Sequence, residues 1–140
     1  MHRIKTRVSS LAALSFAVLL GVAVPALAGT ASTKAAAATV VTVTAGKPSE
    51  FGFTLSTKTV KHGAVTFKFT NKGALPHDFK VCSSSKGGSA TSCAGKATAL
   101  VTPGSSATLT VTFAKAGSYE YLCTVPGHAA AGMKGDLKVT

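Results

Sequence analysis

Residues 65–70 read VTFKFT, a segment in which apolar and polar side chains alternate at every position. Successive side chains of a β-strand point to opposite faces, so this period of two predicts a strand that buries its valine and two phenylalanines. The same period recurs in residues 108–113, TLTVTF, and in residues 51–56, FGFTLS. From residue 39 onward, no segment of about ten residues keeps the period of an α-helix.

Further strands are predicted between turn signals rich in Gly, Pro and Asn. The additional strand candidates are residues 39–45, 77–82, 117–123 and 135–140. The turn signals are Gly46-Lys47-Pro48, His62-Gly63, Asn71-Lys72-Gly73, Pro103-Gly104 and Ala116-Gly117. About seven or eight short strands in about 100 residues are typical of an all-β fold, an antiparallel β-sandwich or barrel with one core. The length of 140 residues fits a single domain.

The first 28 residues have the pattern of an export signal. A short basic segment, MHRIKTR, precedes a mostly apolar segment at residues 11–24, and Ala26-Leu27-Ala28 supplies the small residues of a cleavage site before Gly29. We therefore expect residues 1–28 to be a signal peptide and the protein to be secreted or periplasmic in the cell envelope. The alternative is an uncleaved membrane anchor, because residues 11–28 approach the length that spans a bilayer.

The remainder of the chain divides into a leader and one folded domain. Residues 29–38, GTASTKAAAA, are small and of low complexity, and we expect a flexible leader. Residues 39–140 carry all the predicted strands and form the folded domain. We expect a monomer with no stable membrane insertion after signal cleavage.

The composition limits the kinds of function. The chain has 15 Lys and Arg against 4 Asp and Glu, a net charge of +11, and removal of residues 1–28 leaves 12 − 4 = +8. Four carboxylates give little material for paired acid–base chemistry, so we do not expect an enzyme. The positive charge is typical of a solvated surface, and it also favours an acidic partner protein. Nucleic acid binding is not expected, because basic and aromatic residues do not alternate on a common platform.

The three cysteines separate into a pair and a single thiol. Cys82 ends a predicted strand, and Cys93 follows a segment rich in Ser and Gly. In an exported protein these two are expected to form a disulfide, which would stabilise the fold by roughly 3 kcal/mol through loop closure. Cys123 is then unpaired, and an unpaired thiol in an oxidising compartment is typically buried or bound to metal.

Cys123 lies in a segment with further metal-binding side chains. Cys123, His128 and Met133 are spaced five residues apart, and the Gly and Pro residues between them allow the chain to turn back. His77 offers a second imidazole just before or at the start of a predicted strand. One thiolate, two imidazoles and a weak thioether are the ligands of a trigonal copper site. His62 stands at a turn signal with no sulfur nearby in sequence, and we interpret it as solvated.

The segment Gly117-Ser118-Tyr119-Glu120-Tyr121-Leu122-Cys123, followed by Pro126-Gly127-His128 and Gly132-Met133, resembles the copper loop of the cupredoxins, the plastocyanin/azurin-like blue copper proteins. Residues 65–71 and Pro76-His77 resemble the strand and loop that carry their first histidine. The resemblance implies a Greek-key β-sandwich and one type 1 copper ion that passes single electrons between redox partners by outer-sphere transfer. It also implies that His77, Cys123 and His128 are equatorial ligands and that Met133 is axial.

The sequence departs from the family pattern in two places. Asp78 stands where many members have Asn after the first histidine. A carboxylate accepts hydrogen bonds but cannot donate an amide N–H, so the side-chain link between the ligand loops is not expected in its usual form. The backbone N–H of Asp78 stays available to the Cys123 sulfur. The gap of four residues between Cys123 and His128 is longer than in plastocyanins, and no subfamily follows from it.

The apolar residues next to the histidines predict a docking surface. They are Leu75, Pro76, Pro126, Gly127, Ala129, Ala130 and Ala131, and they would surround an exposed edge of His128. Three alternatives use the same residues differently. The chain could be a copper carrier or storage protein, a structural β-sandwich with a buried Cys123, or a thiol enzyme with a Cys123–His128 pair.

Overall fold

The structure is a computed structural model of the chain and describes residues 38–85 and 93–140. The predicted signal peptide at residues 1–28 and the predicted leader, apart from residue 38, lie outside the described residues. No helix in the described ranges is long and apolar enough to cross a bilayer. The described residues form nine strands: β1 (Thr39–Ala45), β2 (Phe53–Leu55), β3 (Thr59–Val60), β4 (Gly63–Asn71), β5 (Lys80–Cys82), β6 (Gly95–Ala97), β7 (Ser106–Phe113), β8 (Gly117–Leu122) and β9 (Lys134–Val139).

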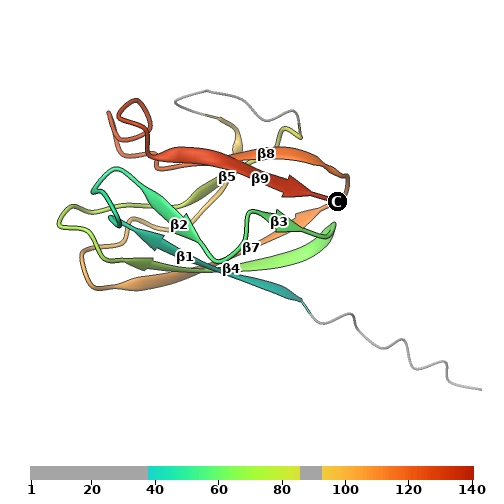
Figure 1. The fold of residues 1–140 in the computed structure, drawn as a ribbon, viewed down its shortest axis with the longest axis horizontal. Coiled ribbons are helices and arrows are strands. Elements are labelled where there is room, and N and C mark those ends of the chain that lie inside the picture. Colours follow the sequence, from blue (N-terminus) through green and yellow to red (C-terminus); the bar gives the residue numbers. More distant parts are fainter. Residues whose placement is uncertain (1–37, 86–92) are drawn as a thin grey trace, which may run out of the picture. The chain divides into compact units, whose positions relative to one another are not determined.

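The strands form two sheets that face each other across one core. One sheet has the order β2-β1-β4-β7 and the other has the order β3-β9-β8-β5-β6 (Figure 1). The predicted all-β sandwich is therefore confirmed. β1 matches its predicted range, whereas β3 and β6 were missed because two or three residues are too few to show a period. The segment predicted at 77–82 forms a strand only from Lys80 onward.

Two strand pairs within the sandwich are parallel rather than antiparallel. β1 pairs with β4 in parallel, and β3 pairs with β9 in parallel. The segment between β1 and β4 carries the chain back along β1 as β2 and then into the other sheet as β3. β4 consequently starts again at the end where β1 began, and both strands run in one direction.

The core is built from the inner faces of the two sheets. Val65, Phe67 and Phe69 of β4 are fully buried, as their alternation predicted. The ring of Phe79 lies 5.2 Å from Phe67, 6.2 Å from Phe69 and 5.5 Å from Tyr121 of β8, measured between ring centroids. Aromatic rings at such distances add to the stabilisation from burial alone. Phe79, two residues after His77, therefore anchors the segment that carries this histidine.

One buried polar side chain shapes the loop before His77. Asn71, at the end of β4, is fully buried and donates hydrogen bonds of 2.8 Å to the carbonyls of Leu75 and Val101. Its side-chain oxygen accepts the N–H of Gly73 at 2.9 Å. A buried amide is stable only when its donors and acceptors are satisfied. Asn71 therefore fixes the course of residues 71–77 from inside the loop.

The predicted disulfide is present. Cys82 at the end of β5 is bonded to Cys93, with a Cα–Cα distance of 5.6 Å, inside the usual disulfide range. Cys123 is the free cysteine, and it is fully buried. The pairing agrees with the sequence argument that isolated this thiol.

Candidate metal centre

The loops that follow β1, β4 and β8 meet at one end of the sandwich, at the left in Figure 1. His77 lies between β4 and β5, and its backbone pairs with Val101 through hydrogen bonds of 3.0 and 2.8 Å. Cys123 follows β8 directly and Met133 immediately precedes β9. His77, Cys123 and Met133 are fully buried, and His128 is 8% exposed.

Backbone hydrogen bonds close the loop from Cys123 to Met133. The N–H of Cys123 donates to the carbonyl of Met133 at 3.1 Å, and the N–H of Met133 donates to the carbonyl of His128 at 3.0 Å. Gly127 and Gly132 have φ values of 87° and 104°, a left-handed region that glycine adopts without strain. The two glycines therefore let the chain return on itself, so that Cys123 and Met133 lie side by side at the base of the loop.

Three donor atoms converge inside this end of the sandwich. The Nδ1 atom of His128 lies 3.5 Å from the Cys123 sulfur, the Nδ1 atom of His77 lies 3.9 Å from it, and the two Nδ1 atoms are 3.1 Å apart. A trigonal ion with bonds of about 2.0–2.3 Å would separate its donors by about 3.5–3.7 Å. The observed separations of 3.1–3.9 Å bracket these values, so the three side chains form a buried group close to the geometry that one metal ion requires.

Burial shifts the pKa values of two of the donors, Cys123 and His128. It raises the pKa of the Cys123 thiol to about 11, although hydrogen bonds from the backbone of Asp78 and Val125 oppose this shift. Burial also lowers the pKa of His128, which favours the neutral imidazole. The thiol therefore keeps its proton in the metal-free protein, and a metal ion that binds sulfur must displace it.

Asp78 links the two ligand loops by acting only as an acceptor. Its carboxylate accepts the backbone N–H of Thr124 at 2.6 Å and also the Thr124 hydroxyl. The sequence analysis did not expect this link in its usual form, because a carboxylate cannot donate an amide N–H. The link takes a different form here, because Thr124, next to Cys123, supplies both donors and the carboxylate only accepts. The backbone of Asp78 bonds to the Cys123 sulfur, as predicted.

Two neighbours of the histidines were not predicted. The Glu50 carboxylate lies 2.9 Å from His77 Nε2, and the ring of Phe51 lies 5.1 Å from that of His128. Both belong to the segment after β1, more than 20 residues before His77 in the sequence. Glu50 follows a turn signal, and Phe51 was expected to begin a strand at residues 51–56, whereas β2 begins only at Phe53. Because Phe51 covers one side of His128, the imidazole is less exposed than predicted.

The surroundings of the site agree with the predicted apolar surface in most positions. Leu75, Pro76, Pro126 and Gly127 are exposed, whereas Ala129 is 3% exposed and belongs to the interior. His62 lies outside the group, and its Nδ1 atom is 3.1 Å from the carbonyl of Thr140.

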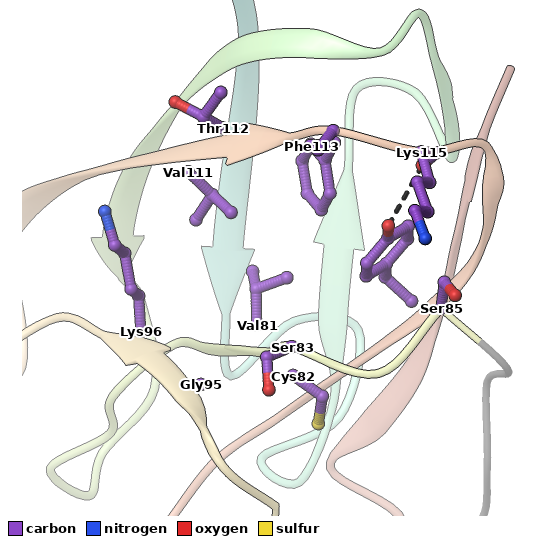
Figure 2. Close-up of a pocket in the computed structure, with 12 residues that line it drawn as sticks. Val81, Cys82, Ser83, Ser85, Gly95, Lys96, Val111, Thr112, Phe113 and Lys115 are labelled. Carbon is purple, nitrogen blue, oxygen red and sulfur yellow. Dashed lines mark hydrogen bonds between the residues drawn. The ribbon is translucent and has the colours of Figure 1, made fainter.

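A separate cavity of about 470 Å³ opens between β5 and β6 on one side and β7 on the other. Figure 2 shows Val81, Val111 and Phe113 in its wall, with Lys96 and Lys115 on opposite sides. None of the four predicted ligands lines this cavity. It therefore plays no part in the candidate metal centre.

Comparison with known proteins gives a consistent result. The profile of the family described as copper binding proteins, plastocyanin/azurin family, matches residues 38–140. The copper-resistant cuproprotein CopI of Pseudomonas aeruginosa is 58% identical over 40 residues, 29% of this chain and 22% of the relative. Auracyanin-B of Chloroflexus aurantiacus is 49% identical over 43 residues, 31% of this chain and 18% of the relative. The two matches thus span about a fifth of each relative's length.

A solved structure supports the same relationship. The auracyanin B structure aligns with 74% of this chain and 89% of its own, with a TM-score of 0.59 and 25% sequence identity. The fold and the buried His–Cys–His group define a cupredoxin. The chain belongs to the plastocyanin/azurin family of copper-binding proteins, and its cofactor is one copper ion.

The contact between Asp78 and Thr124 yields a stability prediction. Asp78→Ala should lower the free energy of unfolding of the metal-free protein by about 1–3 kcal/mol, since it removes hydrogen bonds to a charged acceptor. Chemical denaturation of Asp78→Ala, Thr124→Val and the double variant measures this. The loss of unfolding free energy in the double variant should be smaller than the sum of the two single losses, because both substitutions remove the same contact between the Thr124 hydroxyl and Asp78. Strict additivity would show that the contact between the Thr124 hydroxyl and Asp78 contributes nothing, since the backbone N–H of residue 124 is present in every variant.

Proposed function

We propose that this protein is an exported type 1 copper protein that carries single electrons. In this proposal His77, Cys123 and His128 are the equatorial ligands and Met133 is the axial ligand. The convergence of one sulfur and two Nδ1 atoms in a buried site supports it most strongly. When bound, copper supplies one-electron exchange between its cuprous and cupric states.

The surroundings of the metal centre favour an electron carrier over an enzyme. Four protein ligands would leave no open position for a substrate, unlike the three-ligand arrangement of catalytic metal sites. The backbone bonds at Cys123, His128 and Met133 fix the ligand loop on a rigid sandwich. Such a scaffold limits rearrangement of the ligands when an electron arrives or leaves.

We also propose that partners dock on the apolar surface over His128. Leu75 is 41% exposed and Phe51 is 38% exposed, and Phe51 contacts the His128 ring. A redox partner bound there would be separated from the metal centre only by the imidazole of His128 and the ring of Phe51. The net charge of +8 that remains after removal of residues 1–28 would attract an acidic partner from a distance.

Export is part of the proposal. It is supported by the signal pattern of residues 1–28 and by the disulfide, which forms and persists in oxidising compartments. The domain from residue 39 to residue 140 would act as a monomer after signal cleavage.

Copper transport or storage is the second candidate function. The relative CopI is named as a copper-resistant cuproprotein, and it shares 58% identity over 40 residues. A protein of that kind would hold exchangeable Cu(I), and the same four side chains could bind it.

The absorption spectrum of the Cu(II)-loaded protein separates these functions. An electron carrier should show a strong thiolate-to-copper band in the visible range and give a blue or green solution. Cys123→Ser should abolish the band because it removes the sulfur donor, while the disulfide variant Cys82→Ser/Cys93→Ser should retain it. A colourless protein that binds and exchanges Cu(I) would favour copper transport or storage. Loss of all copper on dialysis would favour a structural domain.

Met133 yields a prediction about the reduction potential. Met133→Gln should lower the potential because an amide oxygen favours Cu(II), and Met133→Leu should raise it because the weak axial donor is lost. A tenfold change in the redox equilibrium corresponds to about 59 mV for one electron. Protein-film voltammetry measures the shifts. If both variants keep the wild-type potential, Met133 is a packing residue only.

The docking surface is tested by electron self-exchange between Cu(I) and Cu(II) forms, measured from NMR line broadening. Leu75→Lys should slow exchange by about tenfold or more, because two surfaces that meet there would carry like charges. Val40→Lys adds the same charge at an exposed position of β1, and it should have a smaller effect. Equal slowing by the two variants would contradict the proposed surface.

A further inference from the structure

Glu50 makes an unusually complete set of contacts for a side chain on a surface turn. Its carboxylate accepts the backbone N–H of Ala74 at 2.9 and 3.0 Å and that of Leu75 at 2.8 Å. The same Oε1 atom lies 2.9 Å from His77 Nε2, the ring nitrogen that faces away from Cys123. Both carboxylate oxygens thus accept backbone N–H groups, and Oε1 also contacts the imidazole of His77.

The chain leaves room for this contact at Gly73. A Cβ atom at residue 73 would lie 2.5 Å from Glu50 Oε1 and 3.0 Å from His77 Nε2. Any side chain there would displace the carboxylate or the imidazole. The Asn71 side chain fixes Gly73 in this position by accepting its N–H at 2.9 Å. The Glu50–His77 pair is therefore built by two segments of the fold, the one after β1 and residues 71–77.

We propose that Glu50 is a positioning residue that holds His77 with Nε2 protonated and Nδ1 free for copper, and that its charge lowers the reduction potential. Since both oxygens of Glu50 accept backbone N–H groups, the carboxylate acts as an acceptor toward His77 as well, and Nε2 is the donor. A carboxylate on the far nitrogen of a metal-binding histidine fixes its tautomer and raises its basicity. A fixed negative charge next to the ligand stabilises Cu(II) more than Cu(I). The inference rests on the proposed copper function.

A purely structural role makes a different prediction. If Glu50 only capped the turn at Ala74 and Leu75, its loss would change the stability of the loop and leave the metal untouched. The reduction potential and the imidazole tautomer therefore distinguish the two roles, whereas the unfolding free energy does not.

The main test compares Glu50→Gln with Asp136→Asn. Both remove one negative charge, and Asp136 is exposed on β9, outside the site. Glu50→Gln should weaken Cu(II) binding relative to Cu(I) binding by about tenfold, because outer partners of metal-binding histidines typically contribute 10–100-fold to affinity. This ratio equals a rise in potential of about 59 mV for one electron. Asp136→Asn should shift the potential much less.

Equal shifts in both variants, or no shift in Glu50→Gln with its blue band retained, would overturn the inference. A wild-type protein without a blue band would instead contradict the copper function itself. The two failures are therefore distinguishable.

A second measurement needs no variant and no copper. Nitrogen-15 NMR of the imidazoles in the metal-free wild-type protein should show His77 with a proton on Nε2 that is coupled to a carboxylate acceptor. A neutral His77 with its proton on Nδ1 would overturn the inference, even if Glu50→Gln failed to fold.

Discussion

The site depends on one constraint, which is that a thiol and two imidazoles are buried where water cannot satisfy them. Each polar atom must find its partner in the protein. The Cys123 sulfur is bonded by the backbone of Asp78 and Val125, and His77 Nε2 is bonded by Glu50. These partners come from the loops after β1, β4 and β8. Satisfying the buried donors therefore fixes the three loops together and sets the positions of the ligands.

The distribution of charge follows from the same constraint. The chain has only four carboxylate side chains against 15 basic ones. Two of the four carboxylates, Glu50 and Asp78, contact the ligand loops. Both are placed by backbone N–H groups. Under the proposed function, the positive surface would attract an acidic partner over long distances, and the carboxylates of Glu50 and Asp78 would place negative charge next to the metal. The first property concerns association and the second concerns the balance between Cu(I) and Cu(II).

Much of this arrangement could be predicted from local sequence. The period of two in residues 65–70 identified β4 and its buried phenylalanines. The even spacing of Cys123, His128 and Met133 predicted a loop that turns back on itself, and the structure brings Cys123 and His128 of this loop together with His77. The short strands β3 and β6 and the parallel pairing of β1 with β4 have no local signal, because they depend on how distant segments meet. Glu50 was missed for this reason. Its partner His77 is 27 positions away in the sequence, and an isolated Glu near a turn predicts nothing by itself.

The most direct test of the account is X-ray absorption spectroscopy of the copper-loaded protein at the copper edge. The account predicts one short copper–sulfur distance of about 2.2–2.3 Å and two copper–nitrogen distances of about 2.0 Å. Cys123→Ser should remove the short sulfur component. A first coordination shell of nitrogen and oxygen alone in the wild-type protein would contradict the claim that Cys123, His77 and His128 bind one ion together.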